Sequence, residues 1–141
     1  MIQRIQSIWL LLSALCSGLI FLVPLGNSES GQKFFVHGWQ TQATEDGNTG
    51  VLWMLVLACA LLPLPVIFQF RKRARQIKMI WTIVVLNLAM AALLLFAIFE
   101  TDQAQPGAGF LLIPASAVFL ILAIVAISKD EKLIRSADRL R

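Results

Sequence analysis

Four long apolar stretches, separated by polar segments, organise the chain. They cover about residues 5–23, 51–70, 79–99 and 110–128, and none of them contains Asp, Glu, Lys, Arg or His. At a helical rise of about 1.5 Å per residue, each stretch can cross the roughly 30 Å hydrocarbon core of a bilayer. Because lipid cannot hydrogen-bond an exposed backbone, such segments are predicted to be helices. The pattern therefore predicts an all-α membrane protein, a bundle of four transmembrane helices in a single domain, residues 1–141.

The connections between these stretches differ in character. The loop at 26–50 is long and carries an apolar FFVHGWQ between polar segments, which indicates a short strand or an interfacial segment between flexible turns. The loop at 100–109 is predicted to be a simple polar connection. The segment 71–78 is short and basic, so the second and third spans are expected to be antiparallel neighbours.

The tail at 129–141 is predicted to be an amphipathic helix reaching at least Ser136. Leu133, Ala137 and Leu140 follow a helical spacing, and Glu131 stands four residues before Arg135, a favourable order for an ion pair on a helix. The tail is expected either to contact anionic lipid or to dock onto a cytoplasmic partner.

The cations set the expected orientation. Eleven of the twelve Lys and Arg residues lie before the first span, between the second and third, or after the fourth, and only Lys33 lies on the other side. Cytoplasmic loops carry such an excess of cations, so both termini are predicted to be cytoplasmic. The loops at 26–50 and 100–109 are then outer loops.

Composition supports a membrane protein, with 58% hydrophobic and 14% charged residues and a mean hydropathy of +0.78. The net charge of +4 does not indicate nucleic-acid binding, because the basic residues sit in short blocks beside the spans, where anionic head groups are the nearest counter-charge. The predicted lipid or partner contacts are Arg71, Lys72, Arg73, Arg75, Lys78, Lys132, Arg135 and Arg139.

Residues that could carry catalysis are sparse. A proton path needs ionisable groups within the spans, and none is present. His37 lies in the first outer loop, and Cys16 and Cys59 each stand alone in a span, so these three do not form a predicted metal site. We expect no catalytic residue, no cofactor and no metal, and hence no enzyme.

The polar feature that remains is within the membrane. Asn87 is the only amide well inside a span, while Pro63 and Pro65 remove amide donors and free backbone carbonyls of the second span. Two hypotheses follow: a bent helix lining a small cavity, as in transporters, or an interhelical hydrogen bond that satisfies the kink. The scarcity of polar groups favours the second. Asn87 is predicted to face the bundle interior and contact the backbone of 59–63, with Ser13 as the next candidate, and the second span to bend by more than about 20°.

The first span also carries small residues at a four-residue spacing, with Ser13 and Ser17 forming one pair and Ala14 and Gly18 the other. Such faces let a neighbouring helix approach closely. The neighbour can be another helix of the same chain or another subunit.

Two terminal motifs and one internal motif carry a resemblance. The opening MIQRIQSIWLLL, the PLG at the end of the first span and the closing SKDEKLIRSADRLR resemble a family of small four-span inner-membrane proteins of the Bacteroidota, catalogued as a domain of unknown function. The resemblance covers the whole chain and implies a location in the bacterial inner (cytoplasmic) membrane. It implies no activity, substrate or cofactor.

Two functions are compatible with these features. The first is a non-catalytic accessory, structural or assembly subunit of an inner-membrane complex, whose partners are membrane lipids and other membrane subunits or a second copy of the chain. The second is a small-solute transporter or channel that works as an oligomer, with Asn87 and the bent second span as its site.

Overall fold

The computed structural model describes the backbone of residues 3–28, 33–36, 38–39, 47–69, 73–100 and 104–138. Most of this part is helical. The helices are α1 (Gln3–Leu19), α2 (Gly47–Leu61), α3 (Pro63–Phe68), α4 (Arg73–Glu100) and α5 (Leu112–Asp138).

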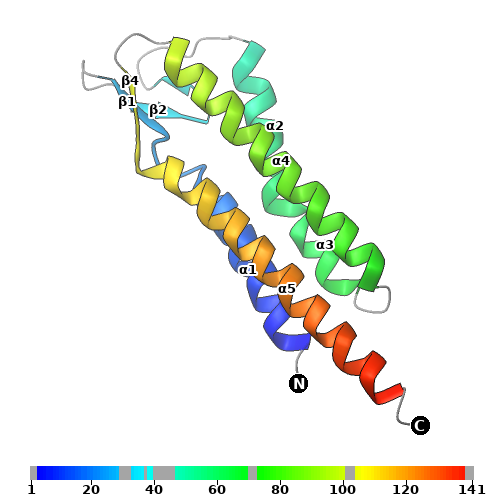
Figure 1. The fold of residues 1–141 in the computed structure, drawn as a ribbon. Helices are drawn as coiled ribbons and strands as arrows, with labels where there is room; N and C mark the ends of the chain where they lie inside the picture. Colours follow the sequence, from blue (N-terminus) through cyan, green and yellow to red (C-terminus); the bar gives the residue numbers. More distant parts are fainter. Residues whose placement is uncertain are drawn as a thin grey trace.

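The helices form an elongated, antiparallel bundle. Helix α1 packs along α5, α2 packs along α4, and α4 also contacts α5. Figure 1 shows that α1 begins and α5 ends at one end of the bundle, here called the terminal end, while the strands gather at the opposite end, here called the sheet end. This arrangement follows from four apolar stretches joined in alternating directions.

Three helical segments are long and apolar enough to cross a membrane, namely Val51–Phe68, Ala74–Phe96 and Ala108–Leu133, and Ile5–Leu19 is a shorter apolar helix. The chain is therefore a membrane protein by the length and composition of its helices. Large apolar side chains also remain exposed outside the core, with Met54 72% and Phe68 78% exposed. Lipid is the environment in which such a surface is stable.

Helix α1 ends at Leu19, four residues before the predicted end of the first span at Val23. The chain continues as a tight turn, in which Leu22 N–H donates to Leu19 O at 3.0 Å. Pro24 disfavours helical geometry at Val23, so the chain does not continue as a helix beyond this turn.

The second predicted span is divided into α2 and α3 at Leu62. Leu62 N–H still donates to Ala58 O at 2.9 Å, but Pro63 and Pro65 have no N–H to give to the carbonyls of Cys59 and Leu61. The interruption lies where two prolines in one turn were expected to produce it, while the size of the bend stays a prediction.

Helical structure extends into the basic segment before the third span and through the tail. Arg75 and Lys78, predicted to lie in a turn, belong to the first turns of α4, which begins at Arg73. Lys and Arg are good helix formers, so nothing in this segment stops the helix. The prediction that the tail is helical to at least Ser136 is confirmed, because α5 continues through Asp138.

A small antiparallel sheet covers the sheet end and corrects the prediction for the loop at 100–109. Strands β1 (Gly26–Ser28), β2 (Lys33–Phe35), β3 (Gly38–Trp39) and β4 (Ala104–Pro106) pair in the order β3-β2-β1-β4. The strands in the loop at 26–50 agree with the expected short strand. The predicted simple connection at 100–109 is wrong, because β4 pairs with β1, placing Asn27 opposite Gln105.

Two glycines allow the second loop to close on the end of the first span. Gly107 N–H donates to Leu25 O at 2.7 Å, and Gly109 N–H donates to Pro24 O at 2.9 Å. A Cβ at Gly107 or Gly109 would lie 2.8 or 2.7 Å from the Pro24 carbonyl oxygen, closer than side chains tolerate. Any larger residue would therefore push the two segments apart.

The core consists of two apolar clusters stacked along the bundle. The sheet-end cluster is formed by Ile20, Leu25, Val36, Leu52, Val56, Met90, Leu94 and Ile113. The terminal-end cluster is formed by Leu10, Val66, Ile80, Ile83, Val84, Leu120, Ala123 and Ile127.

Candidate functional site

A polar layer separates the two clusters. We define the middle layer by five residues that are 1% exposed or less: Ser13, Ser17, Cys59, Asn87 and Ser116. Helical spacing places them there, since each lies one turn from a member of a cluster. Asn87, for example, follows Ile83 of the terminal-end cluster by four residues and precedes Met90 of the sheet-end cluster by three.

Three serine hydroxyls of the middle layer join α1 to α5. Ser116 Oγ lies 3.0 Å from Ser13 Oγ and 3.1 Å from Ser17 Oγ, and all three residues are fully buried. The small-residue face of α1 is thus used within the chain, which answers the question that its spacing left open for Ser13 and Ser17. Their small side chains let the two helices approach closely, and the hydroxyl groups satisfy one another's hydrogen-bonding capacity.

Asn87 lies in the same layer, but its side-chain amide has no such hydrogen bonds among the described residues. Its side chain is 1% exposed, so the prediction that it faces the interior is confirmed. Neither its Nδ2 nor its Oδ1 has a hydrogen-bond partner among the described residues, and the predicted hydrogen bond to the backbone of 59–63 is therefore wrong. Ser13, the next candidate, bonds to Ser116 instead. The position of a residue along a helix does not determine the direction that its side chain takes around the helix axis.

The other candidates for chemistry lie apart. Cys16 and Cys59 are free thiols, one half-buried and one buried. Within the described residues, His, Cys, Asp and Glu side chains form no group of three that could hold a metal ion. Pro63 is buried at the start of α3, and Pro65 is exposed two residues later.

A second polar contact, at the terminal end, was not predicted. Gln6 Nε2 donates to Asp130 Oδ2 at 2.5 Å, and the two side chains are only 6% and 5% exposed. Asp130 Oδ1 has no partner within the described part of the chain. A spacing signal existed, because Asp130 extends the buried stripe of Leu120, Ala123 and Ile127 by one turn, but its place in a charged tail indicated a solvated residue.

Gln76 forms a similar contact between α4 and α3. It is 2% exposed, and its Nε2 donates to the carbonyl of Val66 at 3.2 Å. That carbonyl also accepts the backbone N–H of Gln69 at 3.1 Å, where α3 ends. Gln76 thus holds the start of α4 against the end of α3.

An apolar groove opens beside this contact. It has a volume of about 240 Å³ and is lined by Leu62, Pro65, Val66, Met79, Thr82 and Ile83. The Thr82 hydroxyl donates to Lys78 O at 3.1 Å, so its proton is already engaged within α4. The groove is therefore a surface for apolar groups.

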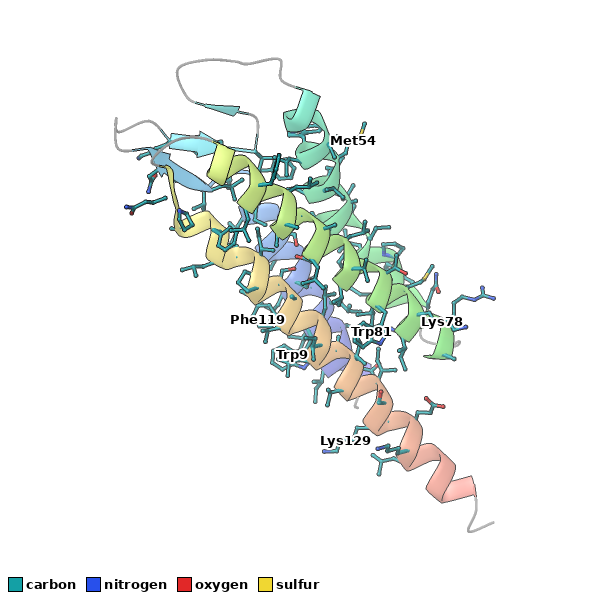
Figure 2. All side chains as sticks on the ribbon, turned by 45° about the horizontal axis from the view of Figure 1, so that its top comes forward. Trp9, Met54, Lys78, Trp81, Phe119 and Lys129 are labelled. Atoms are coloured by element: carbon teal, nitrogen blue, oxygen red, sulfur yellow. The ribbon has the colours of Figure 1, made fainter. Side chains whose placement is uncertain are left out.

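The predicted lipid or partner contacts are described in part. Arg75, Lys78 and Lys132 are exposed on α4 and α5. Figure 2 shows Lys78 and Lys129 at the terminal end, with Trp9 and Phe119 stacked nearby, their ring centres 5.9 Å apart. Arg71, Lys72 and Arg139 lie outside the described residues, and the side chains of Arg73 and Arg135 are not described.

The polar contacts described above join pairs of helices, and they do not bring reactive groups together among the described residues. The described polar side chains of the core are paired across helix interfaces or isolated, and none is a nucleophile beside a base. The arrangement suits binding through surfaces.

The comparisons with known proteins give a family but no function. Neither the search of curated proteins nor the search of solved structures finds a match. A family model described as "Domain of unknown function (DUF4293)" matches residues 2–140. Since that match covers nearly the whole sequence, the chain belongs to the DUF4293 family, whose function is unknown.

Proposed function

We propose that this protein is a non-catalytic accessory or assembly subunit of a bacterial inner-membrane complex, with four spans and both termini in the cytoplasm. In this proposal the shorter apolar helix α1 also spans the membrane, beside α5, which makes four spans in all. The basic terminal end faces the cytoplasm, as the distribution of cations favours. The sheet then lies outside.

The extension of α5 is the observation that carries the proposal. Among the described side chains of α5, Asp130 is the last buried one, at 5% exposed, and the helix continues to Asp138. The eight residues that follow extend the helix by roughly 12 Å beyond this buried contact. Lys132 and Leu133 are exposed on it, and a projecting helix that presents both charge and apolar surface suits a docked partner.

Co-purification of the tagged full chain from its own membranes tests this role. A foreign membrane subunit should be recovered in constant ratio, and Lys132→Glu should lower that ratio several-fold because the variant reverses charge on the docking helix. Lys33→Glu is the matched control, since it makes the same change on an exposed lysine at the sheet end. A chain that purifies alone, or equal losses with both variants, would contradict the proposal.

A transporter or channel acting as an oligomer is the alternative, and one observation favours it. Asn87 is buried, and neither its Nδ2 nor its Oδ1 has a hydrogen-bond partner among the described residues. Both atoms are therefore available to bind a polar solute. In that case Asn87→Leu abolishes uptake into vesicles while the bundle remains folded. For an accessory subunit the same variant leaves the partner ratio unchanged.

A further inference from the structure

We propose that the groove between α3 and α4 is a binding site for one anionic phospholipid, with an acyl chain in the groove and the phosphate on Arg75 and Lys78. This site is independent of the partner contact suggested for α5. It combines an apolar surface, a charged mouth and a position at the membrane interface.

The groove has the shape of a chain-binding site. Val66 and Ile83 form its floor, each 2% exposed, while the exposed Leu62, Pro65 and Met79 form its sides. Its volume of about 240 Å³ is below the roughly 300 Å³ at which pockets enclose a whole small ligand, so it holds a segment of a longer molecule.

Helical register places the two cations at the mouth of the groove. Arg75 precedes Met79 by four residues and Lys78 precedes Thr82 by four, so each cation shares a helix face with a lining residue. Side chains on a helix lean toward its N-terminus, which for α4 is the terminal end. Both guanidinium and ammonium groups therefore extend from the groove toward the membrane surface.

Charge and depth select an anionic phospholipid over a neutral one. Within the described residues, neither Arg75 nor Lys78 has an ion-pair partner, and both are exposed. Trp81, 53% exposed, lies one turn deeper than Lys78, at the depth where indoles mark the boundary between head groups and chains. A phosphate at Arg75 and Lys78 then puts its acyl chain alongside Met79 and Thr82.

Photo-crosslinking in vesicles tests the site with the full chain. The probes are phosphatidylglycerol and phosphatidylcholine that carry the same acyl chain with a mid-chain diazirine, each at trace level in phosphatidylcholine vesicles. We expect adducts on the peptides around 62–66 and 79–83, with phosphatidylglycerol giving about tenfold more because two cations attract its head group. Equal yields from the two lipids would overturn the proposal.

Variants separate a site from general surface charge. Arg75→Gln with Lys78→Gln should reduce the phosphatidylglycerol adducts to the phosphatidylcholine level. The matched control is Lys33→Gln with Lys129→Gln, which removes the same charge away from the groove and should leave both yields unchanged. An equal loss in the control would overturn the proposal.

Two further measurements do not depend on those variants. Met79→Trp fills the groove and should lower the adducts of both lipids. High salt on the wild-type protein should remove the preference for phosphatidylglycerol while leaving phosphatidylcholine adducts in place. Adducts that persist in Met79→Trp, or a preference for phosphatidylglycerol that survives high salt, would overturn the proposal.

Discussion

At the scale of single residues, a tight steric constraint lies where the loop at 100–109 meets the end of the first apolar stretch. A Cβ at Gly109 would stand 2.7 Å from the Pro24 carbonyl oxygen, which is backbone and cannot rotate away. Gly109→Ala should therefore lower the free energy of unfolding by about 1–3 kcal/mol, the range for overpacked sites. Gly18→Ala is the control, since nothing lies within 4 Å of its added Cβ, and it should be neutral or stabilising. Thermal unfolding in detergent measures both, and equal effects would contradict the close approach.

The middle layer offers a contrast between a satisfied and an unsatisfied polar residue. Ser116→Ala removes two hydrogen bonds at once and should cost about 1 kcal/mol, at roughly 0.6 kcal/mol for each bond within a membrane. Asn87→Leu removes an amide without a described partner, so it should cost less than Ser116→Ala or stabilise the bundle. Unfolding titrations in mixed micelles give both values. A larger loss for Asn87→Leu would mean that the amide is bound in the folded protein.

At this scale, the sequence predicts properties that depend on one helix alone, such as the burial of a side chain. It does not predict contacts that depend on how two helices are oriented. The burial of Asn87 was predictable, because an amide facing lipid is unfavourable. The pairing of Ser13 with Ser116 was not, because it depends on how two helices are rotated against each other. Asp130 was missed for a related reason: the composition of its surroundings indicated solvent, whereas its helical register pointed into the bundle.

At the scale of elements, the contact between Gln6 and Asp130 fixes α1 against α5. The carboxylate is buried, so losing its amide donor leaves a charge without that compensation. Gln6→Leu and Asp130→Leu should each destabilise the protein, and the double variant should lose less than the sum of the two. We expect a coupling energy of about 1–3 kcal/mol, as for hydrogen bonds to charged groups. Additive losses in a double-mutant cycle would show that the two side chains act independently.

The elements themselves were largely predictable, since apolar stretches long enough to cross lipid have to be helical. Their ends were less so. The sheet was missed in part because Gly26–Ser28 pairs with Ala104–Pro106, and no local pattern connects segments so far apart in sequence. The basic residues at the start of α4 mark the limit of the apolar span, but they do not end the helix, because Lys and Arg are good helix formers.

At the scale of the whole molecule, the remaining question is which end faces the cytoplasm. The sheet end carries Lys33 and the terminal end carries Arg75, Lys78, Lys129 and Lys132 among the described cations, an imbalance that favours a cytoplasmic terminal end. Lys33 and Lys132 are both exposed and lie at opposite ends of the bundle, so they serve as a pair of reporters.

Cysteine labelling of these two positions tests the orientation. In a background with Cys16→Ala and Cys59→Ala, Lys33→Cys should react with a membrane-impermeant maleimide on intact spheroplasts, because the proposed orientation places the sheet outside. Lys132→Cys should react only after permeabilisation, because the same proposal places the end of α5 in the cytoplasm. Both variants should label equally once the membrane is opened, which controls for burial of the thiol. The reverse pattern would invert the topology, and the extension of α5 could then no longer dock a cytoplasmic partner.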